Sequence, residues 1–319
     1  MNYIYFAIAC LLFSVQFVFT KGFSRRASAA PHVGIWNGFA IALLMLCYLL
    51  PMNGFRVEFS RSAVLYASIL ALCAVCMSLI NVVVMRLGSM VVVTNYVLIG
   101  GMLLPFVYGV LVLKEACSPL KLAAIVLLLL SVVPTMLGRD GEGAAVGGQR
   151  RLGKKLMFHG LCLVQFFANG MTSIVSKAHS ISPDAISSQG FTLLGGMIQA
   201  MLALIALLCF AAADRNAAGK GALRRIFVDV TQARPTTARG VLTLAAFSFG
   251  YALCNGLANV SSNECARTMD ASIQYPAITA VIIVLTAVLG RVCFGEKITR
   301  STAACLLLSL SGAVLFMFA

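Results

Sequence analysis

Long apolar stretches, separated by short polar segments, follow one another along almost the whole chain. A transmembrane helix needs about 20 predominantly apolar residues to cross a hydrocarbon core about 30 Å thick. Backbone polar groups in lipid must be hydrogen-bonded within their own segment, so stretches of this length should be helices. The pattern predicts ten transmembrane helices, at residues 3–20, 34–52, 63–85, 90–113, 119–137, 156–177, 188–212, 240–262, 271–294 and 299–318. We therefore expect an all-α polytopic membrane protein.

The composition agrees with this fold class. The chain is 61% hydrophobic and 11% charged, and its mean hydropathy is +0.96. A soluble protein of 319 residues could not keep so much apolar surface away from water. The net charge of +14 does not indicate a nucleic-acid partner, because the basic residues lie between the apolar stretches rather than on one face. This placement predicts an association with a bilayer that carries anionic headgroups.

The distribution of basic residues also predicts an orientation. Of the 24 Lys and Arg residues, 18 fall in or beside the connections after the odd-numbered helices. By the positive-inside rule these connections, including 138–155 and 213–239, are cytoplasmic and both termini are outside. We expect a multi-pass protein of the cell (plasma) membrane.

A Gly-rich, charged segment divides the predicted helices into two groups of five. Its composition is typical of a flexible linker, and it runs over residues 138–155. The expected units are therefore a first five-helix repeat at 1–137, the linker, and a second five-helix repeat at 156–319.

Short matches between the two groups indicate an internal duplication. Glu115 has a Ser three residues later, and Glu296 has a Thr three residues later, each before an apolar helix. Asn81-Val82 recurs as Asn259-Val260 at the corresponding helix of the second group. Because five is odd, two sequential copies cross the membrane in opposite senses. Inverted repeats of this kind are a common plan of secondary transporters, with the substrate site near the midplane between the halves.

At these motifs the sequence resembles the drug/metabolite transporter superfamily, in particular its EamA-type ten-helix members. The resemblance is carried by residues 105–118, 294–299 and 13–21 and extends over both repeats. It implies two inverted five-helix repeats and transport of small organic solutes. The superfamily also includes carriers of sugar phosphates and nucleotide sugars. The stretch 34–52 lacks the basic residue that members often carry early in the second helix, and members are usually drawn with both termini cytoplasmic.

The candidate substrate-binding residues are amides and phenols inside the predicted helices. Several repeat at a helical spacing, as Asn255 and Asn259 do, and therefore share one helix face. We expect them to line a single central cavity between the halves, because these groups bind neutral or zwitterionic ligands and cost less to bury than charges. The alternative role is hydrogen bonding between helices. The candidates are Gln16, Asn81, Asn95, Tyr96, Gln165, Asn169, Asn255, Asn259, Gln274 and Tyr275.

Charged residues near the helix ends have structural explanations. Glu115 and Glu296 precede helix starts, where a carboxylate is favoured by the helix dipole. No acidic residue lies in the middle of a predicted helix, which argues against proton-driven antiport through an intramembrane carboxylate. Lys21 and Lys177 end the first and sixth helices, where they either extend to the headgroups or place a cation at each mouth of the cavity.

The preferred hypothesis is a secondary transporter of small organic metabolites or drugs that works by alternating access. The alternatives are a carrier of anionic metabolites, which would need basic residues in its cavity, and a membrane-embedded scaffold or enzyme. The sequence contains no P-loop, HExxH motif or nucleophile elbow, so we expect no catalysis, no metal and no cofactor. The expected partner is a small-molecule solute, and pairing with a second copy as a homodimer is left open.

Overall fold

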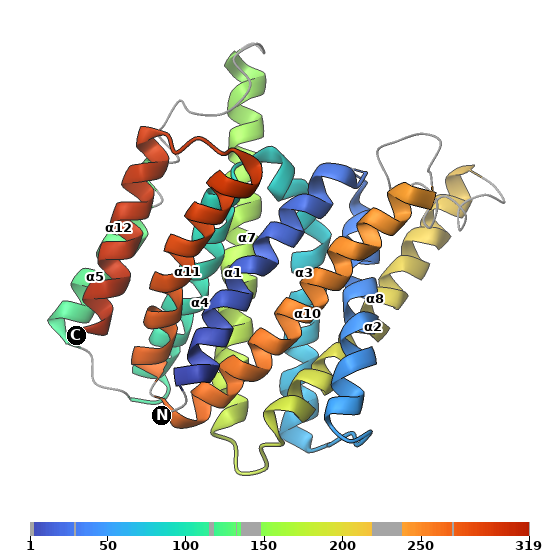
Figure 1. The fold of residues 1–319 in the computed structure, drawn as a ribbon, viewed down its shortest axis with the longest axis horizontal. Coiled ribbons are helices and arrows are strands. Elements are labelled where there is room, and N and C mark those ends of the chain that lie inside the picture. The colour runs from blue at the N-terminus through green and yellow to red at the C-terminus, as the bar shows by residue number, and fades with distance from the viewer. Residues whose placement is uncertain are drawn as a thin grey trace.

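The computed structural model describes residues 3–28, 30–114, 118–131, 133–134, 148–218, 238–269 and 271–318. Its elements are ten α-helices (Figure 1), namely α1 (Tyr3–Arg26), α2 (Pro31–Met52), α3 (Arg61–Leu87), α4 (Met90–Leu111), α5 (Pro119–Leu130), α7 (Gly148–Ser180), α8 (Ser188–Ala218), α10 (Ala238–Thr268), α11 (Ala271–Phe294) and α12 (Arg300–Met317). Within the described residues, eight helices are long and apolar enough to cross a membrane, while α5 and α12 are shorter apolar helices. The chain is a multi-pass, all-helical membrane protein.

The helices begin where short polar side chains can satisfy their first backbone N–H groups. The side chains of Ser60, Ser118 and Thr299 each accept a hydrogen bond from the backbone N–H three residues later, and Ser89 accepts one from Val91. Such N-caps replace partners that the first turn of a helix lacks.

Several helices extend beyond their predicted apolar stretches, most of all α1, α7, α8 and α10. Helix α7 begins at Gly148, so the last part of the predicted linker is helical, and α8 continues to Ala218. The added turns contain Arg, Lys and Ala, which favour helix once a neighbouring apolar segment has nucleated it. The remaining linker residues, 138–147, and Glu115 lie outside the described residues.

Helix α4 lies at the centre of the bundle. In its apolar window 89% of the residues are buried inside the protein, against 22–44% for the other seven long helices. It packs against α7 and α11, while α1 packs against α10 and α2 against α8. Helices α5 and α12 pair with each other at one side of the bundle, on the left of Figure 1.

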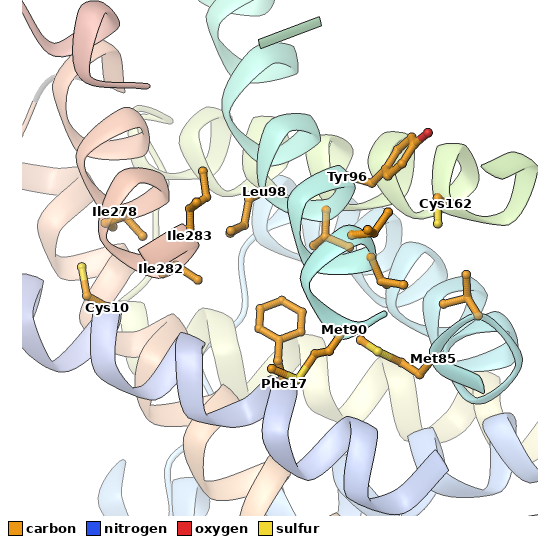
Figure 2. Close-up of a cluster of buried hydrophobic side chains, with 14 residues drawn as sticks. Cys10, Phe17, Met85, Met90, Tyr96, Leu98, Cys162, Ile278, Ile282 and Ile283 are labelled. Carbon is orange, nitrogen blue, oxygen red and sulfur yellow. The ribbon is translucent and has the colours of Figure 1, made fainter. Parts of the chain in front are cut away.

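The largest buried apolar cluster surrounds α4. Phe17 from α1, Met90 from α4 and Ile282 from α11 belong to it, and all three are buried. Figure 2 shows Tyr96 on the side of α4 that faces Cys162 of α7, away from Phe17. Opposite sides of the same helix therefore contact different neighbours.

Glycines permit the close approach of α4 and α7. A Cβ atom at Gly100 would collide with the Phe166 carbonyl oxygen, and one at Gly170 would collide with the Leu104 side chain. Small residues at such crossings are a general feature of helix packing in membranes. Large apolar side chains on the periphery, such as Leu72, Phe167 and Leu307, are exposed in the structure and would contact lipid.

Candidate functional site

A central cavity of about 220 Å³ lies among the eight long helices. Each of α1, α2, α3, α4, α7, α8, α10 and α11 contributes lining residues, whereas the lining includes none from α5 or α12. No Asp, Glu, Lys, Arg or His occurs among the described residues that line it. The cavity is therefore uncharged, with amides, hydroxyls and phenols set among apolar side chains.

Seven of the ten candidate residues line this cavity. They come from five helices, and both predicted halves contribute: Gln16, Asn81, Gln165, Asn169, Asn255, Asn259 and Tyr275. The cavity also takes Ser78 and Asn263, which lie on the same helix faces as Asn81 and Asn259.

A chain of amides crosses from α10 to α1. Asn259 Nδ2 donates to the Asn255 backbone carbonyl at 2.8 Å and to Asn255 Oδ1 at 3.2 Å. Asn255 Nδ2 in turn donates to Gln16 Oε1 at 2.8 Å. Both halves of the chain are thus joined by an amide–amide bond at the cavity wall.

A second amide pair joins α7 to α3. Gln165 Nε2 donates to Asn81 Oδ1 at 3.0 Å, and one turn along α7 Asn169 Nδ2 donates to the Val97 carbonyl of α4 at 2.8 Å. The second buried oxygen of the pair, Gln165 Oε1, has no hydrogen-bond partner among the described residues. The same side chains therefore both line the cavity and form hydrogen bonds between helices.

The other three candidates do not line the cavity. Asn95 donates to Cys305 Sγ of α12 at 2.9 Å, and the Tyr96 hydroxyl lies 2.8 Å from His159 Nδ1 of α7. Gln274 Nε2 donates to the Ser262 carbonyl at 2.8 Å and so supports a cavity residue from behind. Because α4 is enclosed by helices on all sides, its polar residues find partners away from the cavity.

Several lining residues were not predicted. Asn37 and Gln199 are amides within apolar stretches, the same signal that identified Gln165, and could have been found by it. The hydroxyl residues carry less signal, because many of them, such as Thr20 and Thr192, bond to carbonyls of their own helix. The other unpredicted polar lining residues are Thr172, Ser173, Ser176, Tyr251, Ser262 and Thr279.

At one end of the bundle, at the top of Figure 1, a buried ion pair links the helices, and we call it the Lys21 end. Lys21 Nζ donates to the Met85 and Gly88 carbonyls at 2.5 and 2.7 Å and lies 3.6 Å from Glu296 Oε1. Glu296 also accepts from Ser89 Oγ at 2.5 Å and from the Met90 backbone N–H at 3.0 Å. Lys21 is thus only 6% exposed rather than extended to headgroups.

Glu296 also differs from its predicted role. It caps α4, whereas the helix that follows it, α12, is capped by Thr299. The cation and the carboxylate together tie α1, the α3–α4 turn and the α11–α12 turn at one end of the cavity. Arg86 adds further bonds from α3 to the Ser24 and Ala27 carbonyls beyond Lys21.

At the opposite end, which we call the Glu58 end, carboxylates in the connections link the helices. Glu58 accepts from Ser187 Oγ at 2.6 Å and from the Ser187 backbone N–H at 2.7 Å, and these bonds lower the pKa of the Glu58 carboxyl. Asp184 accepts from the hydroxyls of Ser182 and Ser62, which lower its pKa as well. These bonds tie the α2–α3 connection to the α7–α8 connection.

The described residues contain no group of three or more His, Cys, Asp or Glu side chains arranged to hold a metal ion. The Cys73 and Cys76 thiols are free, and their helix α3 is apolar on both sides of them. The site therefore offers hydrogen-bonding and apolar contacts to a ligand.

No protein-family model and no curated protein matches the sequence. Solved structures do match it. One of them, titled "Crystal structure of protein", superposes with a TM-score of 0.57 at 14% sequence identity, covering 96% of this chain and 97% of that chain. At this identity the likeness shows the fold alone, and it extends over the full arrangement of helices.

Proposed function

We propose that the protein is a secondary transporter that moves small organic metabolites or drugs across the plasma membrane by alternating access. The observation that carries the proposal is the uncharged central cavity, whose polar lining comes from both halves of the chain. Ligand sites in proteins are usually concave and mostly apolar, with a few well-placed polar groups. The resemblance to EamA-type transporters points the same way.

The helix contacts support a pair of inverted five-helix repeats, in which α1–α5 correspond to α7, α8, α10, α11 and α12. Under this correspondence the contact of α1 with α10 has its counterpart in α7 with α3, and that of α1 with α11 in α7 with α4. Helices α2 and α8, α4 and α11, and α5 and α12 each pack against their own counterparts. Such pairing is expected across a two-fold axis that lies in the membrane plane.

The two ends of the cavity supply contacts that alternating access would open in turn. Lys21 and Glu296 connect the halves at one end, and Glu58 and Ser187 connect them at the other. A rigid-body movement of one half against the other would break the contacts at one end of the cavity while those at the opposite end remain. The basic residues around the Lys21 end favour its placement in the cytoplasm.

A carrier of anionic metabolites is less well supported. Lys21 and Lys177 each follow a lining residue in sequence, but neither lines the cavity, and Lys21 is already bonded to two carbonyl oxygens and paired with Glu296. The described residues that line the cavity include no cation. An anion would therefore enter without a counter-charge, at a high desolvation cost.

The test is ligand-dependent thermal stabilisation of the purified protein against amino acids, nucleosides, drugs and sugar phosphates. A solute that raises the unfolding temperature would then be measured for uptake into proteoliposomes. We expect at least one uncharged or zwitterionic solute to stabilise the protein and to be transported. If no solute stabilises the protein and is transported, the result contradicts transport and favours the scaffold hypothesis.

A further inference from the structure

The amide groups around the cavity have defined orientations. A backbone carbonyl can only accept a hydrogen bond, so an amide that contacts one must present its nitrogen to it. Asn169 faces the Val97 carbonyl and Asn259 faces the Asn255 carbonyl, both at 2.8 Å. Their NH₂ groups therefore point to helix backbones, and their oxygens are left for other partners.

The same reasoning orients the neighbouring amides. Because Asn259 donates to Asn255 Oδ1, the Asn255 nitrogen is the group that donates to Gln16 Oε1. Gln165 Nε2 faces both Asn81 Oδ1 and, at 3.5 Å, the Met77 carbonyl. These bonds use the oxygens of Gln16 and Asn81 and leave their nitrogens.

Several amide ends around the cavity, Gln165 Oε1 among them, have no hydrogen-bond partner among the described residues, and four others are of two kinds. On α1 and α3 they are nitrogens, Gln16 Nε2 and Asn81 Nδ2; on α7 and α10 they are oxygens, Asn169 Oδ1 and Asn259 Oδ1. All four residues line the cavity. A ligand that fills it would meet donors from α1 and α3 and acceptors from α7 and α10.

No full charge accompanies these groups. The described lining contains no ionisable acid or base other than the tyrosine phenols and has no carboxylate or cation to neutralise a charged ligand. Burying an unpaired ion is far more costly than burying a neutral polar group that finds hydrogen bonds. The arrangement therefore favours molecules whose polarity resides in neutral groups.

We propose that the cavity selects small uncharged solutes that carry both a hydrogen-bond donor and an acceptor, such as primary amides, in preference to their anionic, cationic or donor-free analogues. This inference rests on the proposed transport function and narrows its substrate class. Asn169 and Asn259 accept from the ligand, and Gln16 and Asn81 donate to it.

The test compares analogues that share one skeleton and differ in charge or in donor. The pyridine series is nicotinamide, methyl nicotinate, nicotinate and 3-aminomethylpyridine; the branched series is isovaleramide, methyl isovalerate, isovalerate and isoamylamine, with leucine as the zwitterion. Binding to the purified full-length protein is measured by calorimetry at neutral pH. We expect the amide of a series to bind more tightly than its ester and its ions by on the order of tenfold, a difference of about 1.4 kcal/mol.

The site residues are tested by the ratio of amide to ester affinity. Asn169→Leu removes one free oxygen and should bring this ratio close to one, whereas the control Asn95→Leu, which lies outside the cavity, should leave it unchanged. Asn259→Ala replaces the first variant if that variant does not fold. An unchanged ratio in both cavity variants would overturn the assignment.

The outcomes separate this inference from the transport proposal. Tightest binding of an acid, an amine, an ester or leucine would overturn the selection for uncharged donor-bearing solutes while leaving a solute-binding transporter intact. Absence of binding by every member of both series, together with no response in the wider solute screen, would overturn both.

Discussion

The ammonium nitrogen of Lys21 lies 3.6 Å from Glu296 Oε1, and their side chains are only 8% and 12% exposed. The two residues are separated by most of the chain, yet they meet at the turn that begins α4. Glu296 accepts a hydrogen bond at the N-terminus of α4, and Lys21 donates one at the C-terminus of α3. Each charge therefore also offsets the partial charge of a helix end. The pair is a direct polar link between the halves at this end.

Replacing Lys21 with Met should destabilise the protein by about 3 kcal/mol, because a buried carboxylate loses its partner. Thermal unfolding in detergent measures the change, with Lys297→Met, an exposed neighbour of Glu296, as the control. The cost of Lys21→Met should be smaller in a Glu296→Gln background, since the charge to be paired is absent there. Equal costs in the two backgrounds would show that the ion pair contributes nothing.

The Glu58 end should be sensitive to acid. Hydrogen bonds from Ser187 hold the pKa of Glu58 below its ordinary value of 4.5. The ionised carboxylate therefore stabilises the fold above that pH, and this contribution is lost as the pH falls through the lower folded-state pKa. We expect the unfolding temperature of the wild type to fall more steeply below about pH 4.5 than that of Glu58→Gln. Parallel curves would contradict this role of Glu58.

Two glycines of α7 should respond oppositely to the same substitution. Gly170 faces α4, where an added methyl would meet Leu104, while Gly160 has nothing within 4 Å of an added Cβ. Gly170→Ala should cost about 1–3 kcal/mol through overpacking. Gly160→Ala should be neutral or stabilising by up to about 1 kcal/mol because alanine favours helix. The folded yield and the unfolding temperature of the two variants measure this difference. Equal effects of the two substitutions would argue against close α4–α7 packing.

The orientation is testable by labelling. Single cysteines at Gly147, which lies outside the described residues, and at Ala218, at the end of α8, would be placed in a cysteine-free background. We expect both to be cytoplasmic and protected from an impermeant thiol reagent applied to intact cells. Labelling from outside would reverse the orientation and agree with the arrangement usually drawn for EamA-type members.

The helices could be predicted from the sequence because their signal is local. The apolar stretch 271–294 has the same bounds as α11, whereas α1, α7, α8 and α10 extend by several residues into polar segments. The positions of Asn95 and Tyr96 relative to the cavity could not be predicted. Helix α4 is apolar and buried on all sides, so its sequence pattern does not show which face lines the cavity. The capping of α4 by Glu296 depends on a tertiary contact that no local pattern indicates.

Asn259 offers the most direct test of the cavity as the transport site. Among the described residues its side chain hydrogen-bonds only to Asn255, one turn earlier on the same helix, so Asn259→Leu leaves the Asn255–Gln16 bond between α10 and α1 in place. Asn255→Leu, which breaks that bond, is the matched variant that reports the structural role of the amide chain.

The measurement is uptake into proteoliposomes of the solute found by thermal stabilisation, together with the folded yield from size-exclusion chromatography. We predict that Asn259→Leu lowers uptake by on the order of tenfold, the loss expected for one buried hydrogen bond to the ligand, while the folded yield stays near that of the wild type. Unchanged uptake, or loss of the folded protein itself, would contradict the central claim and make the amide stripe a packing seam between helices.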